Sequence, residues 1–155
     1  MGSGASIRVL MNEVSSKAKS ALLQRSHRPL REYDLAAINR GPLAMGLLTG
    51  KYTAVTAPAA DDVRGEKSPE WMKYFVNGKP SVEWISKRDA VREIITSGGR
   101  TTAQGAICWL WSRSAKTIPI PGFRTVVQVR ENAGALSFDP LDAGQMKEID
   151  RLLGR

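Results

Sequence analysis

The chain has 155 residues, of which 42% are hydrophobic and 25% charged, a mixture typical of one soluble globular domain. No stretch approaches the roughly 20 apolar residues of a membrane-spanning helix, and the N-terminus carries no apolar run typical of a secretory signal. We therefore expect a cytoplasmic protein that does not bind membranes. The single cysteine, Cys108, excludes an internal disulfide, and its apolar neighbours predict a place in the core.

The formal net charge is +8, from 23 basic and 15 acidic side chains. Residues 1–40 contain seven basic and three acidic groups, so about half of the excess lies in the first quarter of the chain. A basic excess of this size is typical of proteins that bind nucleic acid, an anionic surface or a phosphate-rich ligand. The alternative is a solvated basic segment without such a partner.

The first half of the chain contains few regular elements. Residues 7–11 fit either a short strand or the beginning of a helix, and residues 13–25 can form a helix with one apolar stripe. Residues 35–39 are an apolar run without alternation, which is typical of a strand buried on both faces of a parallel sheet. A loop follows over residues 53–80, with a short helix predicted over residues 69–76.

Four capped helices and one strand are predicted in the second half. Ser, Thr and Asp side chains accept hydrogen bonds from the free N–H groups at a helix start, and two of these helices begin with the spacing of a capping box. The order of strand, helix, helix, strand and helix indicates an α/β protein with parallel strands. The strand is expected over residues 117–120, and the helices over residues 81–97, from Thr101 (capping box with Gln104), from Thr125 (capping box with Gln128) to about Ala135, and from Asp142 to about Gly154.

Residues 118–132 carry the most specific pattern. A strand ends at Gly122 and leads into a capped helix, so free N–H groups near residues 125–127 point at the strand's C-terminal edge, where an anion would bind. Arg124 adds a positive charge whose planar fork suits phosphate. Three polar side chains share one face of this helix and could read the edge of an adenine ring: Gln128, Glu131 and Asn132. The alternative is that Gln128 is only a cap partner and that Glu131 and Asn132 are solvated.

These residues resemble the adenosine-phosphate loop and following helix of the aldo-keto reductases. Residues 41–52 resemble the other late cofactor loop of that family, usually Ser-Pro-Leu followed by Gly-Leu-Leu-Thr-Gly-Lys. The resemblance extends from Glu32 to Asp150. It implies a (β/α)8 barrel with its site at the C-terminal ends of the strands, bound NADP(H), and reduction of a small carbonyl substrate.

The resemblance also implies roles for nine residues in binding NADP(H). One group would line the path of the pyrophosphate and ribose, with the lysine near the pyrophosphate: Pro42, Leu43, Gly46 and Lys51. Gly41 stands where the family usually has serine, which removes a hydroxyl contact. In a second group, Gly122 and Arg124 would hold the 2′-phosphate side of the cofactor. The adenine end would be held by Gln128, Glu131 and Asn132. No metal site is predicted.

The family's catalytic set of Asp, Tyr, Lys and His is not found in this sequence. His27 is the only histidine and is interpreted as an isolated surface residue. Tyr33, Tyr52 and Tyr74 lack a partnered Lys and His in the family order. The sequence therefore names no catalytic residue.

The region of resemblance includes only two barrel strands. We predict a helix-rich α/β fold in which residues 32–155 form an incomplete (β/α)8 barrel fragment, a truncated reductase whose first part was replaced by a basic segment of unknown origin, residues 1–31. Two strands leave sheet edges and inner faces bare. We expect the N-terminal segment, a second copy of the chain, or both to cover them, which predicts a homo-oligomer.

Three functions are compatible with these patterns. The leading prediction is a truncated aldo-keto reductase that binds NADP(H), with weak or no NADPH-dependent reduction of aldehydes or ketones. The second is a non-enzymatic module that binds NADP(H) or has lost it and acts in regulation or interaction. The third is a basic nucleic-acid-binding protein, which lacks aromatic residues interleaved with the basic N-terminal charges.

Overall fold

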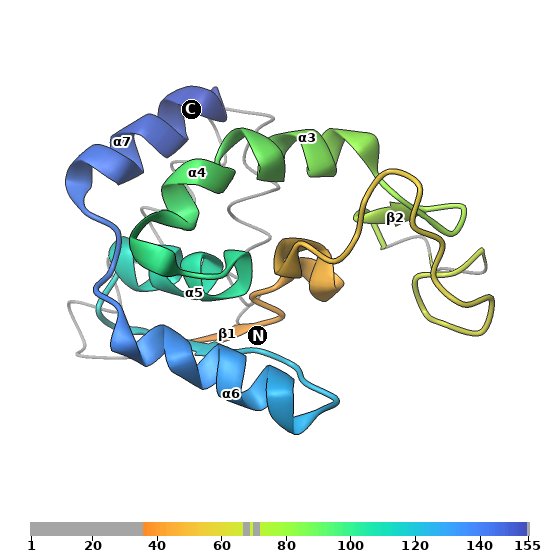
Figure 1. The fold of residues 1–155 in the computed structure, drawn as a ribbon, viewed down its shortest axis with the longest axis horizontal. Coiled ribbons are helices and arrows are strands. Elements are labelled where there is room, and N and C mark those ends of the chain that lie inside the picture. The colour runs from red at the N-terminus through yellow and green to blue at the C-terminus, as the bar shows by residue number, and fades with distance from the viewer. Residues whose placement is uncertain (1–35, 67–68, 70–71, 155) are drawn as a thin grey trace.

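The computed structural model describes residues 36–66, 69 and 72–154 (Figure 1). The predictions for residues 1–31, and for His27 and Tyr33, lie outside the described residues. The described chain is rich in helix, and none of its helices has the length and apolar character needed to cross a membrane. Its elements follow in the order β1 (Ala37–Arg40), the 3-10 turn η2 (Ala44–Thr49), β2 (Phe75–Val76), β3 (Lys79–Pro80), α3 (Val82–Ala90), α4 (Arg92–Ile95), the 3-10 turn η3 (Ser97–Gly99), α5 (Thr102–Arg113), β4 (Thr117–Ile120), α6 (Val126–Gly134), the 3-10 turn η4 (Ala135–Ser137) and α7 (Ala143–Leu152).

β1 and β4 form a two-stranded parallel sheet in which Ala37 lies opposite Thr117. The predicted pair of parallel strands is thus confirmed. β4 has its predicted bounds, whereas β1 lies slightly further along the chain than expected, which is common for strand ends. Parallel strands end at the same edge of a sheet, so the chain leaves β1 at Gly41 and β4 at Pro121 on the same side.

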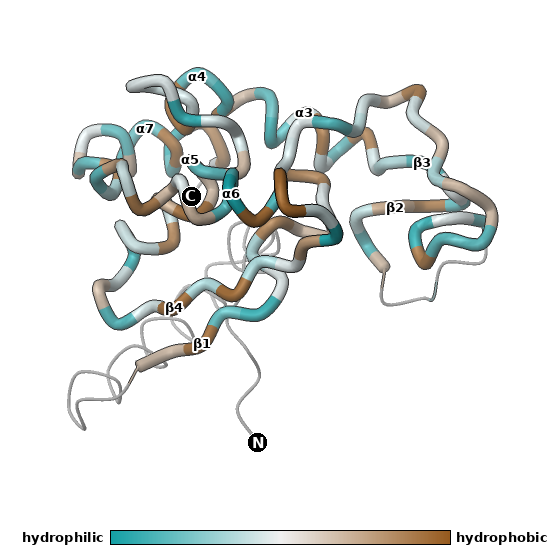
Figure 2. The backbone as a smooth tube through the Cα atoms, turned by 60° about the horizontal axis from the view of Figure 1, so that its bottom comes forward, coloured by the Kyte–Doolittle hydropathy of each residue, from teal (hydrophilic) through white to brown (hydrophobic). Residues whose placement is uncertain are grey.

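The described residues cover only one face of the sheet. Asn39 and Thr117 share a face and are buried, whereas Ile38, Ile118 and Ile120 share the other face and are 62%, 49% and 47% exposed. Figure 2 shows the helices gathered on one side of the two strands. The prediction that the first strand is buried on both faces is therefore wrong for Ile38, because helix α5 packs against the sheet from one side.

Helix α5 is the centre of the hydrophobic core. It contacts η2, α4, β4, α6 and η4, and its side chains from Ala106 to Leu110 are all buried. The predicted capping box is present, since Thr101 Oγ1 accepts a hydrogen bond from Gln104 N–H (3.2 Å) and Gln104 Oε1 accepts one from Thr101 N–H (2.9 Å). Cys108 is fully buried, as predicted, and burial raises the pKa of its thiol.

Close packing of α4 on α5 depends on Gly105. A Cβ atom built on this residue would lie 2.0 Å from the carbonyl oxygen of Ile95 and 2.7 Å from the carbonyl carbon. These are backbone atoms at the end of α4, which cannot rotate away as a side chain would. Only glycine therefore allows the two helices to approach this closely.

The helix predicted over residues 81–97 is divided in two. Ser81 precedes α3, but its side chain makes no capping hydrogen bond, and the chain departs from helical geometry at Val91 (φ −100°, ψ 1°) before α4. The predicted stop is confirmed, because Gly98 has a left-handed φ of +70°. The last helix, α7, begins at the predicted cap, Asp142, which forms a capping box with Gln145.

The short helix predicted over residues 69–76 is wrong. Phe75 and Val76 form β2, which pairs with β3 in an antiparallel hairpin. The two residues of the turn, Asn77 and Gly78, both have positive φ (50° and 71°), as a type I′ hairpin turn requires. Phe75 is buried, with its ring 4.9 Å edge-on from that of Tyr52, so the hairpin is attached to the core at the loop that follows β1.

Candidate cofactor site

The loop after β1, residues 41–52, has an irregular backbone. Ala44, Met45 and Gly46 are successive residues with left-handed φ values of 49°, 56° and 89°, which is unusual for the first two. The N–H of Gly46 donates to the carbonyl of Leu43 (2.9 Å), as does that of Leu48 (3.3 Å). This local strain is held by the surrounding structure, as is common at binding sites.

The predicted site residues of this loop differ in exposure. The side chains of Pro42 and Leu43 are buried in the core, so a cofactor would meet their backbone. Lys51 is exposed, and its Nζ lies 4.7 Å from the centroid of the buried Tyr52 ring. Gly46 is half-buried, and a Cβ atom there would lie 3.3 Å from the Tyr52 ring.

Arg64, which the sequence did not single out, lies against this loop. Its Nη1 donates to the carbonyl of Met45 (3.0 Å) and its guanidinium lies 5.4 Å from the Tyr52 ring centroid. It also forms an ion pair with Asp62, donating through Nε at 2.7 Å. Hydrogen bonds from Arg64 hold the pKa of the Asp62 carboxyl well below its usual range, and the charge of Arg124 adds a smaller effect of the same sign.

The loop after β4 leads to the start of α6. Gly122 has no other atom within 4 Å of a Cβ built on it, and Arg124 is exposed. The expected capping box is only half formed, because Thr125 Oγ1 accepts from Gln128 N–H (3.2 Å) but Gln128 Oε1 accepts from Arg124 N–H (2.7 Å) rather than from Thr125. Gln128 is therefore a cap partner, with its amide nitrogen still available as a donor.

Glu131 and Asn132 lie one turn further along α6 and are half-buried. The carbonyl of Glu131 accepts a hydrogen bond from Gln104 Nε2 (3.1 Å), which ties α6 to the start of α5. The loop after β1 and the loop that leads into α6 thus begin at one edge of the sheet, and together with the first turns of α6 they carry all nine predicted residues.

No catalytic set is assembled among the described residues. Tyr52 is buried, with the Lys51 ammonium group 4.7 Å and the Arg64 guanidinium 5.4 Å from its ring centroid, and the ring of Tyr74 packs edge-on against Trp84 at 5.8 Å. No group of three or more His, Cys, Asp or Glu side chains is gathered in the described part of the chain as a metal site would require.

Arg88 is a buried charged residue that the sequence motifs do not include. It lies on α3 and contacts the loop after β1, as described below. A signal for it was present, because Trp84, Ile85, Arg88, Val91 and Ile95 share one helical stripe and all five are buried. An arginine inside an apolar stripe indicates a paired, buried charge.

A sequence model of the aldo/keto reductase family matches residues 5–153. The chain belongs to the aldo/keto reductase family. The match begins at residue 5, so it includes most of residues 1–31, which lie outside the resemblance from Glu32 to Asp150; the boundary at residue 31 remains a prediction. Membership agrees with the helix-rich fold with parallel strands, although the described residues contain only two of them.

Two relatives in the aldo/keto reductase family illustrate the extent of the similarity. The chain is 32% identical over 119 residues to "Aldo-keto reductase yakc [NADP(+)]" of Schizosaccharomyces pombe, covering 77% of this chain and 33% of that protein. It is also 32% identical over 107 residues to the chloroplastic pyridoxal reductase of Arabidopsis thaliana, covering 69% of this chain and 26% of that protein. The chain thus spans about a third of the length of these relatives or less.

Proposed function

We propose that the chain binds NADP(H) between the loop after β1 and the loop after β4. The observation that carries this proposal is the exposed Arg124 beside the capped start of α6, at the same sheet edge as the loop with Lys51. Helix N–H groups and an arginine fork favour phosphate, and Lys51 adds a second positive charge. The relative named as NADP(+)-dependent supports the choice of cofactor.

The residues of the site fit the three parts of the cofactor. Open space at Gly122 and the exposed fork of Arg124 suit the 2′-phosphate. The Gln128 amide donor and the polar groups of Glu131 and Asn132 suit adenine, and the strained backbone at Gly46 suits close approach of a pyrophosphate. Lys51 would neutralise that pyrophosphate. Its position on the Tyr52 ring limits where the ammonium group can lie.

We further propose that carbonyl reduction by this chain is slow or absent. Bound NADPH would supply a hydride to an aldehyde or ketone carbon, and the carbonyl oxygen then needs a proton. Neither described tyrosine is well placed to donate it, because Tyr52 is buried and Tyr74 packs on Trp84. Without a positioned general acid, the proton must come from water, which is a poor donor. The loss of general acid catalysis lowers the rate by about 10²- to 10⁴-fold.

The same burial of Tyr52 favours a second candidate function, a non-enzymatic NADP(H)-binding module. The exposed isoleucine face of the sheet, formed by Ile38, Ile118 and Ile120, would then serve self-association. Both candidates require the cofactor. They differ only in whether bound NADPH is consumed.

Titration of NADPH and NADH into the wild type, Arg124→Ala and Arg130→Ala tests the cofactor. Arg130 is an exposed arginine of α6, so its removal changes the net charge equally and serves as the control. We expect the wild type and Arg130→Ala to prefer NADPH, and Arg124→Ala to lose roughly 10- to 100-fold in NADPH affinity with little change for NADH. Equal loss in both arginine variants would show only a general charge effect.

Two further results decide between the candidates. Absence of NADPH binding to the wild type would refute both. Loss of NADPH absorbance with a broad panel of aldehydes would establish a reductase, whereas tight binding without turnover would support the module.

A further inference from the structure

A buried arginine connects α3 to the loop that carries Lys51. Arg88 is only 5% exposed, and its Nη1 donates to two carbonyl oxygens of that loop, those of Tyr52 (2.7 Å) and Leu47 (3.3 Å). Its Nε donates to Asp89 Oδ1 at 2.8 Å. A buried guanidinium is costly unless it is paired and hydrogen-bonded, so these acceptors are what keep the charge in the interior.

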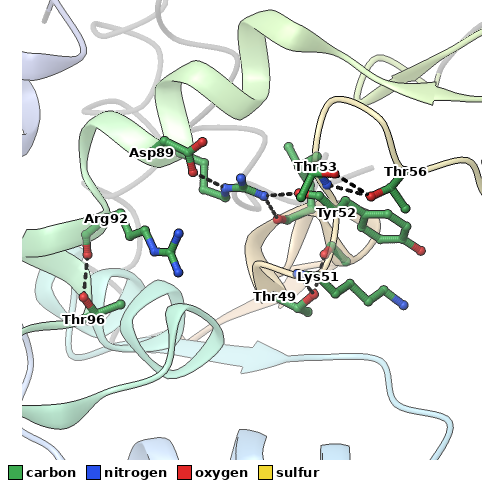
Figure 3. A network of polar contacts seen from close by, with 11 residues as sticks. Thr49, Lys51, Tyr52, Thr53, Thr56, Asp89, Arg92 and Thr96 are labelled. Carbon is green, nitrogen blue, oxygen red and sulfur yellow. Dashed lines mark hydrogen bonds and ion pairs between the residues drawn. The ribbon is translucent and has the colours of Figure 1, made fainter.

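The two carbonyl groups flank the part of the loop that matters for the cofactor. Leu47 and Tyr52 are the first and last residues of a turn that contains Gly50, with a left-handed φ of 79°, and Lys51. Because one nitrogen atom bonds both carbonyls, Arg88 fixes the distance between them. Figure 3 shows Asp89 of α3 beside the loop residues Lys51 and Tyr52. The two hydrogen bonds join residues separated by 41 and 36 positions in sequence, so they are long-range contacts that attach α3 to the loop.

The position of Lys51 is linked to Tyr52, the residue whose carbonyl Arg88 bonds. Tyr52 presents its ring to the Lys51 ammonium group at 4.7 Å, and Arg88 bonds the carbonyl of the same tyrosine. Release of that carbonyl would free the backbone that carries both the ring and the lysine.

We propose that Arg88 is a positioning residue for the cofactor site, which holds the turn from Leu47 to Tyr52 so that Lys51 is presented to the pyrophosphate. This role rests on the proposed function of Lys51 in NADP(H) binding. Arginine suits it because its planar fork directs separate donors at the loop and at Asp89, whereas lysine has one compact ammonium group. Lysine therefore restores the contact to the loop only in part.

The test compares Arg88→Met and Arg88→Lys with Arg92→Met as the control. Arg92 is an exposed arginine of the adjacent helix α4, so its replacement removes the same group without a loop contact. Three measurements are made on each variant: the NADPH dissociation constant, the melting temperature, and hydrogen exchange of the amides of Gly46 and Leu48, both bonded to the Leu43 carbonyl.

We expect Arg88→Met to weaken NADPH binding and speed loop exchange by roughly tenfold, because it removes hydrogen bonds from a charged donor. Arg88→Lys should recover part of both effects, and Arg92→Met should match the wild type. If Arg88→Met does not fold, Arg88→Lys carries the test, with an expected severalfold loss of affinity measured at a temperature at which this variant is fully folded.

A double substitution separates positioning from general stability. If Arg88 acts through Lys51, Lys51→Met and the pair Lys51→Met with Arg88→Met should bind NADPH equally weakly, since effects on one unit are not additive. Full additivity, or wild-type affinity and exchange in Arg88→Met, would overturn the proposal. If the wild type itself fails to bind NADPH, the proposed function fails, and exchange of the loop amides alone then shows whether Arg88 holds the turn.

Discussion

Gly105→Ala should separate α4 from α5. The new Cβ would lie 2.0 Å from the Ile95 carbonyl oxygen, whereas unstrained carbon–oxygen contacts begin at about 3.3 Å, so the two backbones must move apart by roughly 1 Å. Overpacking of this kind costs about 1–3 kcal/mol, and a backbone clash lies at the upper end of that range. Alanine regains about 1 kcal/mol of helix propensity, which leaves a net loss of about 2 kcal/mol.

A loss of that size lowers the melting temperature by roughly 4–8 °C for a chain of this length, measurable by circular dichroism. Gly144→Ala in the first turn of α7 is the matched control, because its Cβ would meet only the Asp142 carboxylate at 3.2 Å, and it should change stability by less than about 1 kcal/mol. A melting temperature of Gly105→Ala equal to or above that of the wild type would refute the packing argument.

Two other predictions concern charge and association. The Asp62 carboxyl has a pKa lowered by Arg64, so its ion pair stabilises the fold above the ordinary carboxyl pKa of about 3.9 and loses this contribution as the pH falls further. Asp62→Asn should therefore be less stable by about 1 kcal/mol at pH 7, with the difference narrowing below about pH 4 in urea titrations; a constant difference would contradict the ion-pair explanation. Ile118→Ser should weaken self-association through the sheet face in sedimentation experiments, and a wild type that remains monomeric at micromolar concentration would count against association altogether.

Local chemistry was enough to predict several elements of this fold. The bounds of β4 and the caps at Thr101 and Asp142 were predicted because short-range hydrogen bonds and apolar runs determine them. The Asn77-Gly78 turn was equally local, and its dipeptide is a strong hairpin signal, but the short strands beside it were mistaken for a helix.

Long-range contacts account for what the sequence could not supply. Nothing near Arg64 in the chain indicates that it bonds the carbonyl of Met45, and the exposure of Ile38 depends on which face α5 covers. The two loops of the candidate site were identified by their motifs. The partners of the two arginines that hold the first loop could not be predicted, because they lie 19 to 41 residues away, although the apolar stripe around Arg88 indicates that this residue is buried.

The single cysteine gives this protein a built-in probe of its own motions. Cys108 is fully buried, with Sγ 3.8 Å from the carbonyl of Ala135 in η4, and burial disfavours its reactive thiolate. A thiol reagent can reach it only when the packing around α5 opens. The rate at which a thiol reagent labels the wild-type chain therefore reports how often the core opens. Slower labelling in the presence of NADPH would show that a ligand at the sheet edge stabilises the closed core.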